Sequence, residues 1–116
     1  MTITETSTTA EVLRAALDFM RRPLGRRANR WRQGDYGTTK GCVCSVGAIR
    51  AVATGYTSLP IFRIAQVEKA MSALAAAAGI ERGKWEVIRW NDIEGRTFAE
   101  IEAVFEKAIE KAEASA

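Results

Sequence analysis

The chain has 116 residues and a net charge of +3, so its length is that of one domain. With 47% hydrophobic residues, the composition is that of a protein with a packed core, which excludes a disordered chain. The sequence contains no histidine, and this excludes Ser-His-Asp catalysis, Cys-His catalysis and any histidine metal ligand.

Two observations bear on localisation. The longest nearly apolar run, residues 71–80, is about half as long as a membrane-spanning helix. The first residues do not show the charged and then apolar pattern of a secretion signal. We therefore expect a cytoplasmic protein that does not contact a membrane.

The first predicted element is a helix over residues 9–22, preceded by a flexible, Thr/Ser-rich segment at residues 1–8. Thr8 and Glu11 have the spacing of a capping box, and Pro23 stops the helix. Apolar residues recur at helical spacing along it, at Val12, Leu13, Ala16, Leu17 and Met20.

Residues 23–41 are predicted to form a long loop rich in glycine and arginine. A loop of this length in a compact domain is unusual, and such loops are more often functional or mobile. Residues 1–50 hold nine Lys/Arg against four Asp/Glu, whereas residues 51–116 hold eight against ten, so the positive charge concentrates around this loop. The basic and aromatic side chains in this loop and just before it are Arg21, Arg22, Arg26, Arg27, Arg30, Trp31, Arg32 and Tyr36.

Two interpretations of these side chains stay open. In the first they form a solvated loop, because short basic runs are common on protein surfaces. In the second they bind a partner, since arginine, tryptophan and tyrosine are enriched at protein interfaces. The same residue types also contact phosphates and stack on bases, so a nucleic acid is the alternative partner.

Three further helices are predicted downstream. A buried helix over residues 44–54, in which Gly47 and several alanines would let another helix approach closely, ends at Gly55. The next helix opens at residues 58–60, with Pro60 in its first turn, and buries a face that begins at Ile64. The last covers residues 98–111. Between them, residues 83–90 are expected to form a short helix or an extended linker, because a lone strand would have no partner.

The spacing of Cys42 and Cys44 does not favour a metal site or a disulfide. Two ligands cannot complete a structural zinc site, and a disulfide between residues two apart would be strained. At the start of a helix the Cys44 thiol would have a lowered pKa, but the chain offers it no histidine base. We favour a small buried residue beside Gly47.

Residues 90–100 join an aromatic and polar turn to a helix start, where Thr97 and Glu100 have capping-box spacing. The favoured interpretation is structural: the tryptophan anchors the turn in the core, and the Asn or Asp side chain bonds backbone amides. In that interpretation Arg96 pairs with Asp92 or with a buried carbonyl. The alternative is a polar pocket for a small ligand, formed by Trp90, Asn91, Asp92 and Arg96.

Three short motifs carry a resemblance: residues 44–49 (CSVGAI) followed by Ala51, residues 90–97 (WNDIEGRT) and, more weakly, residues 31–34 (WRQG). Together they resemble a family of small proteins from actinobacteria and their phages that is defined only as a domain of unknown function. The resemblance covers about residues 10–110. It implies a helical domain and a phage origin but no reaction, and the arginine-rich loop departs from the compact pattern of that family.

These patterns predict an all-α fold: one small domain of about four main helices over residues 9–112, with a long Arg/Gly-rich loop between the first two and a frayed end at residues 113–116. We expect a binding protein and not an enzyme, with no cofactor and no metal. It would act on a host macromolecule through the basic loop at residues 23–41. The expected partner is a protein, and nucleic acid is the alternative. A homodimer through the apolar faces of residues 60–78 and 98–111 stays open.

Overall fold

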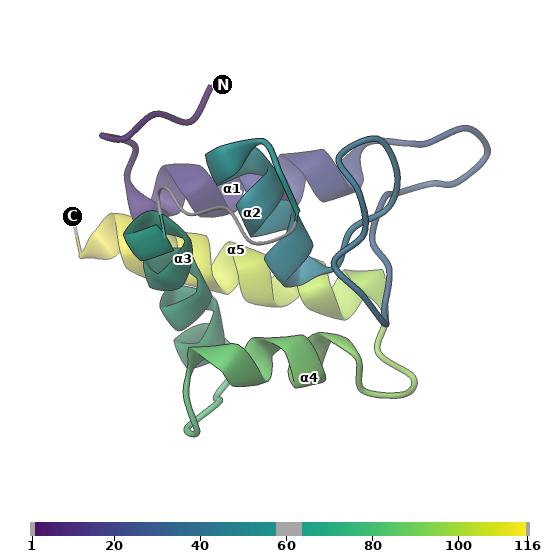
Figure 1. Ribbon diagram of the computed structural model, residues 1–116. Coiled ribbons are helices and arrows are strands. Elements are labelled where there is room, and N and C mark those ends of the chain that lie inside the picture. The colour runs from purple at the N-terminus through teal and green to yellow at the C-terminus, as the bar shows by residue number, and fades with distance from the viewer. Residues whose placement is uncertain (1, 58–63, 116) are drawn as a thin grey trace.

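The computed structural model describes residues 2–57 and 64–115, which contain five α-helices and one 3-10 turn (Figure 1). Their order is α1 (Thr9–Arg21), α2 (Ser45–Thr54), α3 (Ile64–Ala77), η1 (Lys84–Glu86), α4 (Val87–Asn91) and α5 (Phe98–Ala114). These two ranges hold isolated β-bridges but no strand. The predicted all-α class and single domain are confirmed. Of the two forms expected for residues 83–90, a short helix or an extended linker, the structure has the short helix, as η1 and α4. None of the described helices is both long and apolar enough to cross a membrane.

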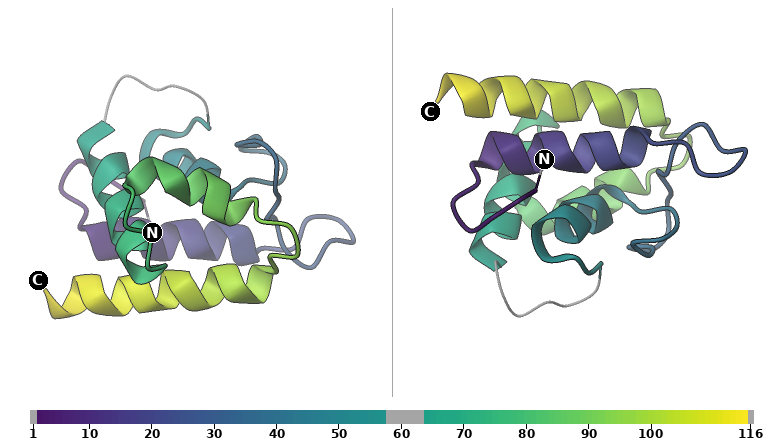
Figure 2. Two further views of the ribbon diagram at one scale, coloured as in Figure 1. Left: turned by 90° about the horizontal axis from the view of Figure 1, so that it is seen from below. Right: turned by 90° about the horizontal axis from the view of Figure 1, so that it is seen from above.

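Helices α1 and α5 lie side by side and run antiparallel (Figure 2). Exposed ion pairs link them at both ends: Arg14 pairs with Glu113 at 2.8 Å, and Arg21 pairs with Glu102 at 2.7 Å. Exposed pairs of this kind contribute about 0–1 kcal/mol each, so the main stabilisation comes from the apolar faces that the two helices bury against α2 and α3.

Both predicted capping boxes are present. Thr8 Oγ1 accepts a hydrogen bond from the Glu11 amide, and Glu11 Oε1 accepts one from the Thr8 amide, at 3.1 and 2.7 Å. Thr97 and Glu100 make the same reciprocal pair at the start of α5. Each box satisfies two amides that a helix start leaves without partners, which explains why α1 and α5 begin where they do.

The predicted helix bounds agree with the structure to within three residues where both are described. Helix α2 begins at Ser45 with Cys44 as its N-cap, and Gly55 ends it with a φ of +84°. Helix α5 continues to Ala114, beyond its predicted end at residue 111. The predicted opening of the third helix at residues 58–60 lies outside the described residues. Ile64, expected on the buried face of that helix, is instead 48% exposed.

The segment before α1 differs from the flexible tail that its composition predicts. Ile3 is 6% exposed and belongs to the core. The Gln66 side chain donates hydrogen bonds to the carbonyls of Thr4 and Ser7, at 2.8 and 3.2 Å. The apolar side chain of Ile3 and the side-chain amide of Gln66 in α3 therefore attach this segment to the helices.

The apolar faces of α3 and α5, which the sequence offers for a homodimer, are buried within the chain itself. They meet the faces of α1 and α2 in one core (Figure 2). The largest core side chains from α3 and α5 are Met71, Leu74, Ile101 and Phe105, all fully buried. These faces are therefore occupied by the protein's own helices.

Candidate functional site

The side chain of Asn91, at the end of α4, is fully buried and binds three separate segments. Its Oδ1 accepts hydrogen bonds from Trp31 Nε1 at 2.8 Å, from the Ser45 amide at 3.0 Å and from Ser45 Oγ at 2.6 Å. Its Nδ2 donates to the Arg32 carbonyl at 3.1 Å and to Asp92 Oδ1 at 2.9 Å. One carboxamide thus joins the segment between α1 and α2, the start of α2 and the end of α4.

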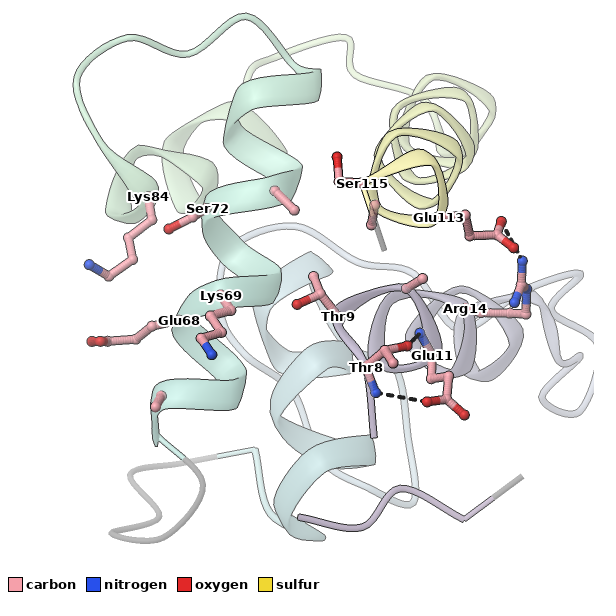
Figure 3. A pocket seen from close by; sticks show the side chains of 14 residues that line it. Thr8, Thr9, Glu11, Arg14, Glu68, Lys69, Ser72, Lys84, Glu113 and Ser115 are labelled. Carbon is pink, nitrogen blue, oxygen red and sulfur yellow. Dashed lines mark hydrogen bonds and ion pairs between the residues drawn. The ribbon is translucent and has the colours of Figure 1, made fainter. Parts of the chain in front are cut away.

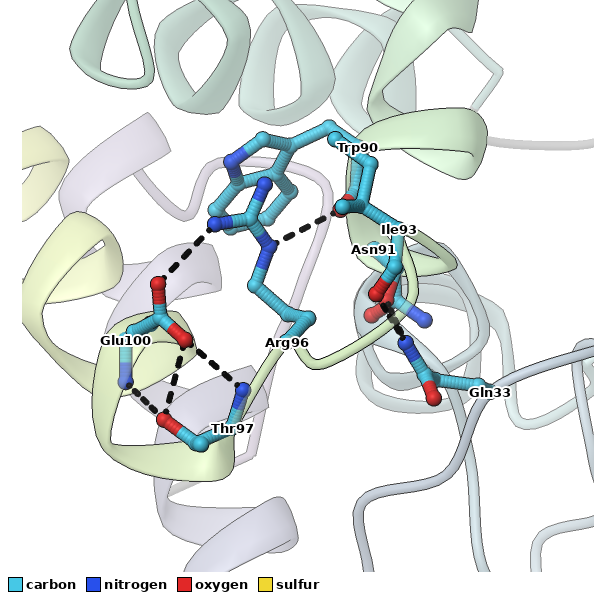
Figure 4. Close-up of polar contacts among 7 residues, drawn as sticks. All are labelled: Gln33, Trp90, Asn91, Ile93, Arg96, Thr97 and Glu100. Atoms are coloured by element: carbon cyan, nitrogen blue, oxygen red, sulfur yellow. Dashed lines mark hydrogen bonds and ion pairs between the residues drawn. The ribbon is translucent and has the colours of Figure 1, made fainter.

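Two neighbouring side chains extend this network. Gln33 Nε2 donates to the carbonyls of Asn91 and Ile93, at 3.0 and 2.8 Å (Figure 4). Asp92 Oδ1 accepts a hydrogen bond from the Gly34 amide at 3.0 Å. Residues 31–34 are therefore attached to residues 91–93 by both side-chain and backbone groups.

Arg96 closes the turn between α4 and α5. Its Nε donates to the Trp90 carbonyl at 3.0 Å, and its guanidinium lies 5.0 Å from the centre of the Trp90 ring (Figure 4). Its Nη1 pairs with Glu100 at 3.2 Å. Of the two partners predicted for Arg96, the carbonyl is the one observed, and the carboxylate it pairs with is Glu100 rather than Asp92. The backbone amide and then the hydroxyl of Thr97 lower the pKa of the Glu100 carboxyl.

Gly47 in α2 is needed for a close backbone approach. A Cβ at this position would lie 2.0 Å from the carbonyl oxygen of Tyr36, which is far inside contact distance. The sequence suggested that Gly47 lets another helix approach, and this is wrong, because the approaching backbone belongs to the segment between α1 and α2. The Tyr36 ring then packs against the guanidinium of Arg50, which lies 4.5 Å from the ring centre and is 6% exposed.

The three short motifs at residues 31–34, 44–49 and 90–97 therefore meet in one place, and their contacts support the structural interpretation of residues 90–97. The four side chains suggested for a polar pocket have different surroundings. Trp90 and Asp92 line an open cleft of about 660 Å³ together with Arg82 and Arg89, whereas Asn91 is enclosed in the network.

Several arginines of the predicted binding segment make contacts within the chain. Arg21 pairs with Glu102 and Glu106 of α5, and Arg32 pairs with Asp35 at 3.2 Å. The guanidinium of Arg30 lies 5.2 Å from the centre of the Phe19 ring.

The two aromatic residues of the segment are also engaged. Trp31, besides its bond to Asn91, stacks on Phe98 with ring centres 6.3 Å apart. Tyr36 lies against Arg50.

The remaining arginines occupy residues 22–27, which we call the basic turn. The amide of Leu24 donates to the Arg27 carbonyl at 3.1 Å, and the Arg27 amide donates back to the Leu24 carbonyl at 2.9 Å. Gly25 has a φ of +58°, in the left-handed region that glycine adopts without strain. The turn projects from the end of α1, away from the helices (Figures 1 and 2). The segment predicted as one long loop is thus divided into this turn and a part that packs on the helices.

Three exposed side chains give the basic turn its charge: Arg22, Arg26 and Arg27. Within the described residues none of the three has a carboxylate partner. Arg27 Nη2 donates a 3.5 Å hydrogen bond to the Trp31 carbonyl. The turn therefore presents three positive charges to the solvent.

Both cysteines are free thiols, and Cys44 is 3% exposed. Its Sγ accepts a hydrogen bond from the Gly47 amide at 3.3 Å, as an N-cap of α2. Burial raises the pKa of the Cys44 thiol and outweighs the hydrogen bonds that lower it. The favoured prediction, a small buried residue beside Gly47, is confirmed, whereas the alternative of a lowered thiol pKa is not observed, because the site is desolvated. In the described part of the chain, Cys, Asp and Glu side chains form no group of three that could hold a metal ion.

A wider groove, which the sequence did not indicate, lies between the start of α1, the outer face of α3 and the end of α5 (Figure 3). It is open and has a volume of about 1010 Å³. Its charged lining is mixed: Glu11, Glu68 and Glu113 against Arg14, Lys69 and Lys84. Because the lining comes from distant segments, no local pattern could have revealed it.

Comparison with curated proteins and with solved structures found no match. A family model does match, over residues 4–111, and so covers the described helices α1 to α4, most of α5 and the three motifs that meet around Asn91. The chain therefore belongs to DUF6197, a family of unknown function.

Proposed function

We propose that this is a non-enzymatic binding protein that engages an acidic surface of a protein partner through the basic turn. The observation that carries the proposal is the exposure of Arg22, Arg26 and Arg27 on a hydrogen-bonded, projecting turn with no carboxylate partner among the described residues. Arginines held in this way can form bidentate ion pairs with carboxylates at a reduced entropic cost.

The surroundings of the turn favour a protein over a nucleic acid. Binding of single strands relies on aromatic platforms for stacking, and here Trp31 and Tyr36 are engaged with Phe98 and Arg50. Arg21 and Arg32 are paired with carboxylates, which shortens the basic surface that a phosphate backbone would follow. What remains is a compact basic tip, suited to a local acidic patch.

The available side chains also support a binding role rather than catalysis. The chain has no histidine, and the most buried thiol, Cys44, has a raised pKa that disfavours the nucleophilic thiolate. Asp92 Oδ1 is occupied by the Gly34 amide and the Asn91 amide. The Cys44 thiol and the Asp92 carboxylate therefore act in hydrogen bonds that support the fold.

The motif resemblance adds a biological setting to the proposal. If the chain is phage-borne, its partner is a macromolecule of an actinobacterial host, met in the host cytoplasm. The binding turn would then modify the activity of a host protein, with no chemistry of its own.

The test is capture from an actinobacterial lysate by the tagged protein, with and without nuclease. The turn variant is Arg22→Ala, Arg26→Ala, Arg27→Ala. The matched control is Arg82→Ala, Lys107→Ala, Lys111→Ala, which removes the same charge from exposed positions elsewhere. We expect one host protein to be retained by the native chain and the control after nuclease treatment, and to be lost with the turn variant.

Equal capture by all three proteins would eliminate the basic turn as the binding surface. Capture that disappears on nuclease treatment, and that falls steeply with salt, would instead assign the turn to nucleic acid.

A further inference from the structure

The chain that leaves the basic turn is held at two consecutive residues. The amide of Arg30 donates to the Met20 carbonyl at 2.8 Å, and the Val43 amide donates to the Arg30 carbonyl at 2.6 Å. The next residue, Trp31, donates its indole N–H to Asn91. The turn therefore starts directly from α1 and returns to an anchored position on the helical body.

Asn91 is the shared partner at this anchor. It is fully buried, and both ends of its carboxamide are hydrogen-bonded, so its side chain has one arrangement that satisfies every bond. It belongs to α4, which packs on α2. The orientation of the segment at residues 31–32 is thereby tied to the helices rather than to the local chain alone.

We infer that Asn91 is a positioning residue for the basic turn. Through Trp31 and the Arg32 carbonyl it holds in place the segment that follows the turn, and so it presets the direction in which Arg26 and Arg27 project. Being fully buried, Asn91 does not contact the partner itself. The inference rests on the proposed binding role of the turn, since preorganised groups bind more tightly because less freedom is lost on association.

The test compares Trp31→Phe, which removes the indole donor to Asn91 and leaves a smaller aromatic ring beside Phe98, with Trp85→Phe, the same change at a tryptophan that is 50% exposed. Two quantities are measured on each folded protein. The first is amide-exchange protection at Arg30 and Val43, with the amides of α1 as an internal reference. The second is affinity for poly-L-glutamate over a range of salt concentrations.

We expect Trp31→Phe to lower the protection of Arg30 and Val43 by about tenfold, the equivalent of one buried hydrogen bond, with α1 unchanged. Affinity for poly-L-glutamate should fall while its salt dependence stays the same, because the arginines that form the ion pairs are all still present. A loss caused by removed charge would reduce the salt dependence as well. Trp85→Phe should match the native protein in both measurements.

Unchanged protection in Trp31→Phe, or lowered protection with native affinity, would overturn the positioning role and leave the proposed function standing. If the native protein itself does not bind poly-L-glutamate, the acidic-partner proposal fails, and the protection measurement alone decides whether Asn91 orients the turn. Should Trp31→Phe not fold, Gln33→Ala replaces it, since it removes the donors to the Asn91 and Ile93 carbonyls from the partly exposed side of the network.

Discussion

Trp31 and Asn91 lie 60 residues apart in the sequence, and the Trp31 indole donates a 2.8 Å hydrogen bond to Asn91 Oδ1. The same indole stacks on Phe98, at the start of α5. One side chain from a segment without helix therefore contacts the end of one helix and the start of the next. Asn91 Oδ1 also accepts hydrogen bonds from the amide and hydroxyl of Ser45, so the motifs around residues 31, 45 and 91 meet at this side chain.

Removal of the Asn91 side chain should be among the most destabilising single changes. Asn91→Ala would leave the Trp31 indole, the Ser45 amide and the Arg32 carbonyl without their buried partner, at a cost of about 3 kcal/mol in the free energy of unfolding. Urea denaturation would measure it. Asp18→Ala, which truncates a side chain of similar size at an exposed position of α1, is the control and should stay close to the native value. If Asn91→Ala lowered the free energy of unfolding no more than the control does, the hydrogen-bond network would contribute little to stability.

Gly47→Ala should destabilise the protein by overpacking. The new methyl group would meet backbone atoms of Tyr36, which cannot rotate away as a side chain would. We therefore expect the free energy of unfolding to fall by about 3 kcal/mol. Gly41→Ala is a milder control, because its Cβ would approach only the Thr38 hydroxyl, at 3.0 Å. Thermal unfolding of the two variants separates them. Similar melting temperatures would show that the Tyr36 backbone yields easily.

The capping carboxylates predict a loss of stability in acid. The pKa values of Glu11 and Glu100 are lowered below their ordinary 4.5, mainly by the Thr8 and Thr97 amides respectively. A carboxyl with a lowered folded-state pKa stabilises the fold fully above its unfolded-state pKa, and that stabilisation disappears as the pH falls through the folded-state pKa. Stability should therefore begin to fall near pH 4.5 and decrease further below it.

Substitution by glutamine tests the origin of this acid sensitivity. Glu100→Gln keeps a capping acceptor but removes the titration, so its stability between about pH 7 and pH 3, followed by urea unfolding, should depend less on pH than that of the native protein. The control, Glu110→Gln, alters an exposed position of α5 outside the capping box. If both variants retain the native pH profile, the capping box is not its source.

The two thiols should differ in reactivity. Cys44 is buried with a raised pKa, whereas Cys42 is partly exposed, so iodoacetamide at neutral pH should label Cys42 well before Cys44. Mass spectrometry of the digested protein would give both rates, and labelling in denaturant supplies the reference in which the two become similar. Faster labelling of Cys44 in the folded protein would contradict the burial described above.

The features that sequence alone determined are those made by neighbours along the chain. The Thr8–Glu11 and Thr97–Glu100 boxes, the stop of α1 before Pro23 and the end of α2 at Gly55 depend on atoms a few residues apart, so residue type and spacing were enough. Helical periodicity likewise identified most of the core, because it reports which face of each helix is apolar.

Only the tertiary structure decided how the polar side chains are used. Arg21 resembles Arg22 and Arg26 in the sequence, yet it faces two α5 carboxylates that lie 81 and 85 residues away, whereas the basic turn carries the other two into solvent. The sequence identified Gly47 as a point of close approach, but it did not identify the Tyr36 backbone as the group that approaches it. Asn91 and its donors are likewise distant in sequence. Such partners are selected by the packing of helices, which places groups together through the summed burial of many side chains and leaves no local signal.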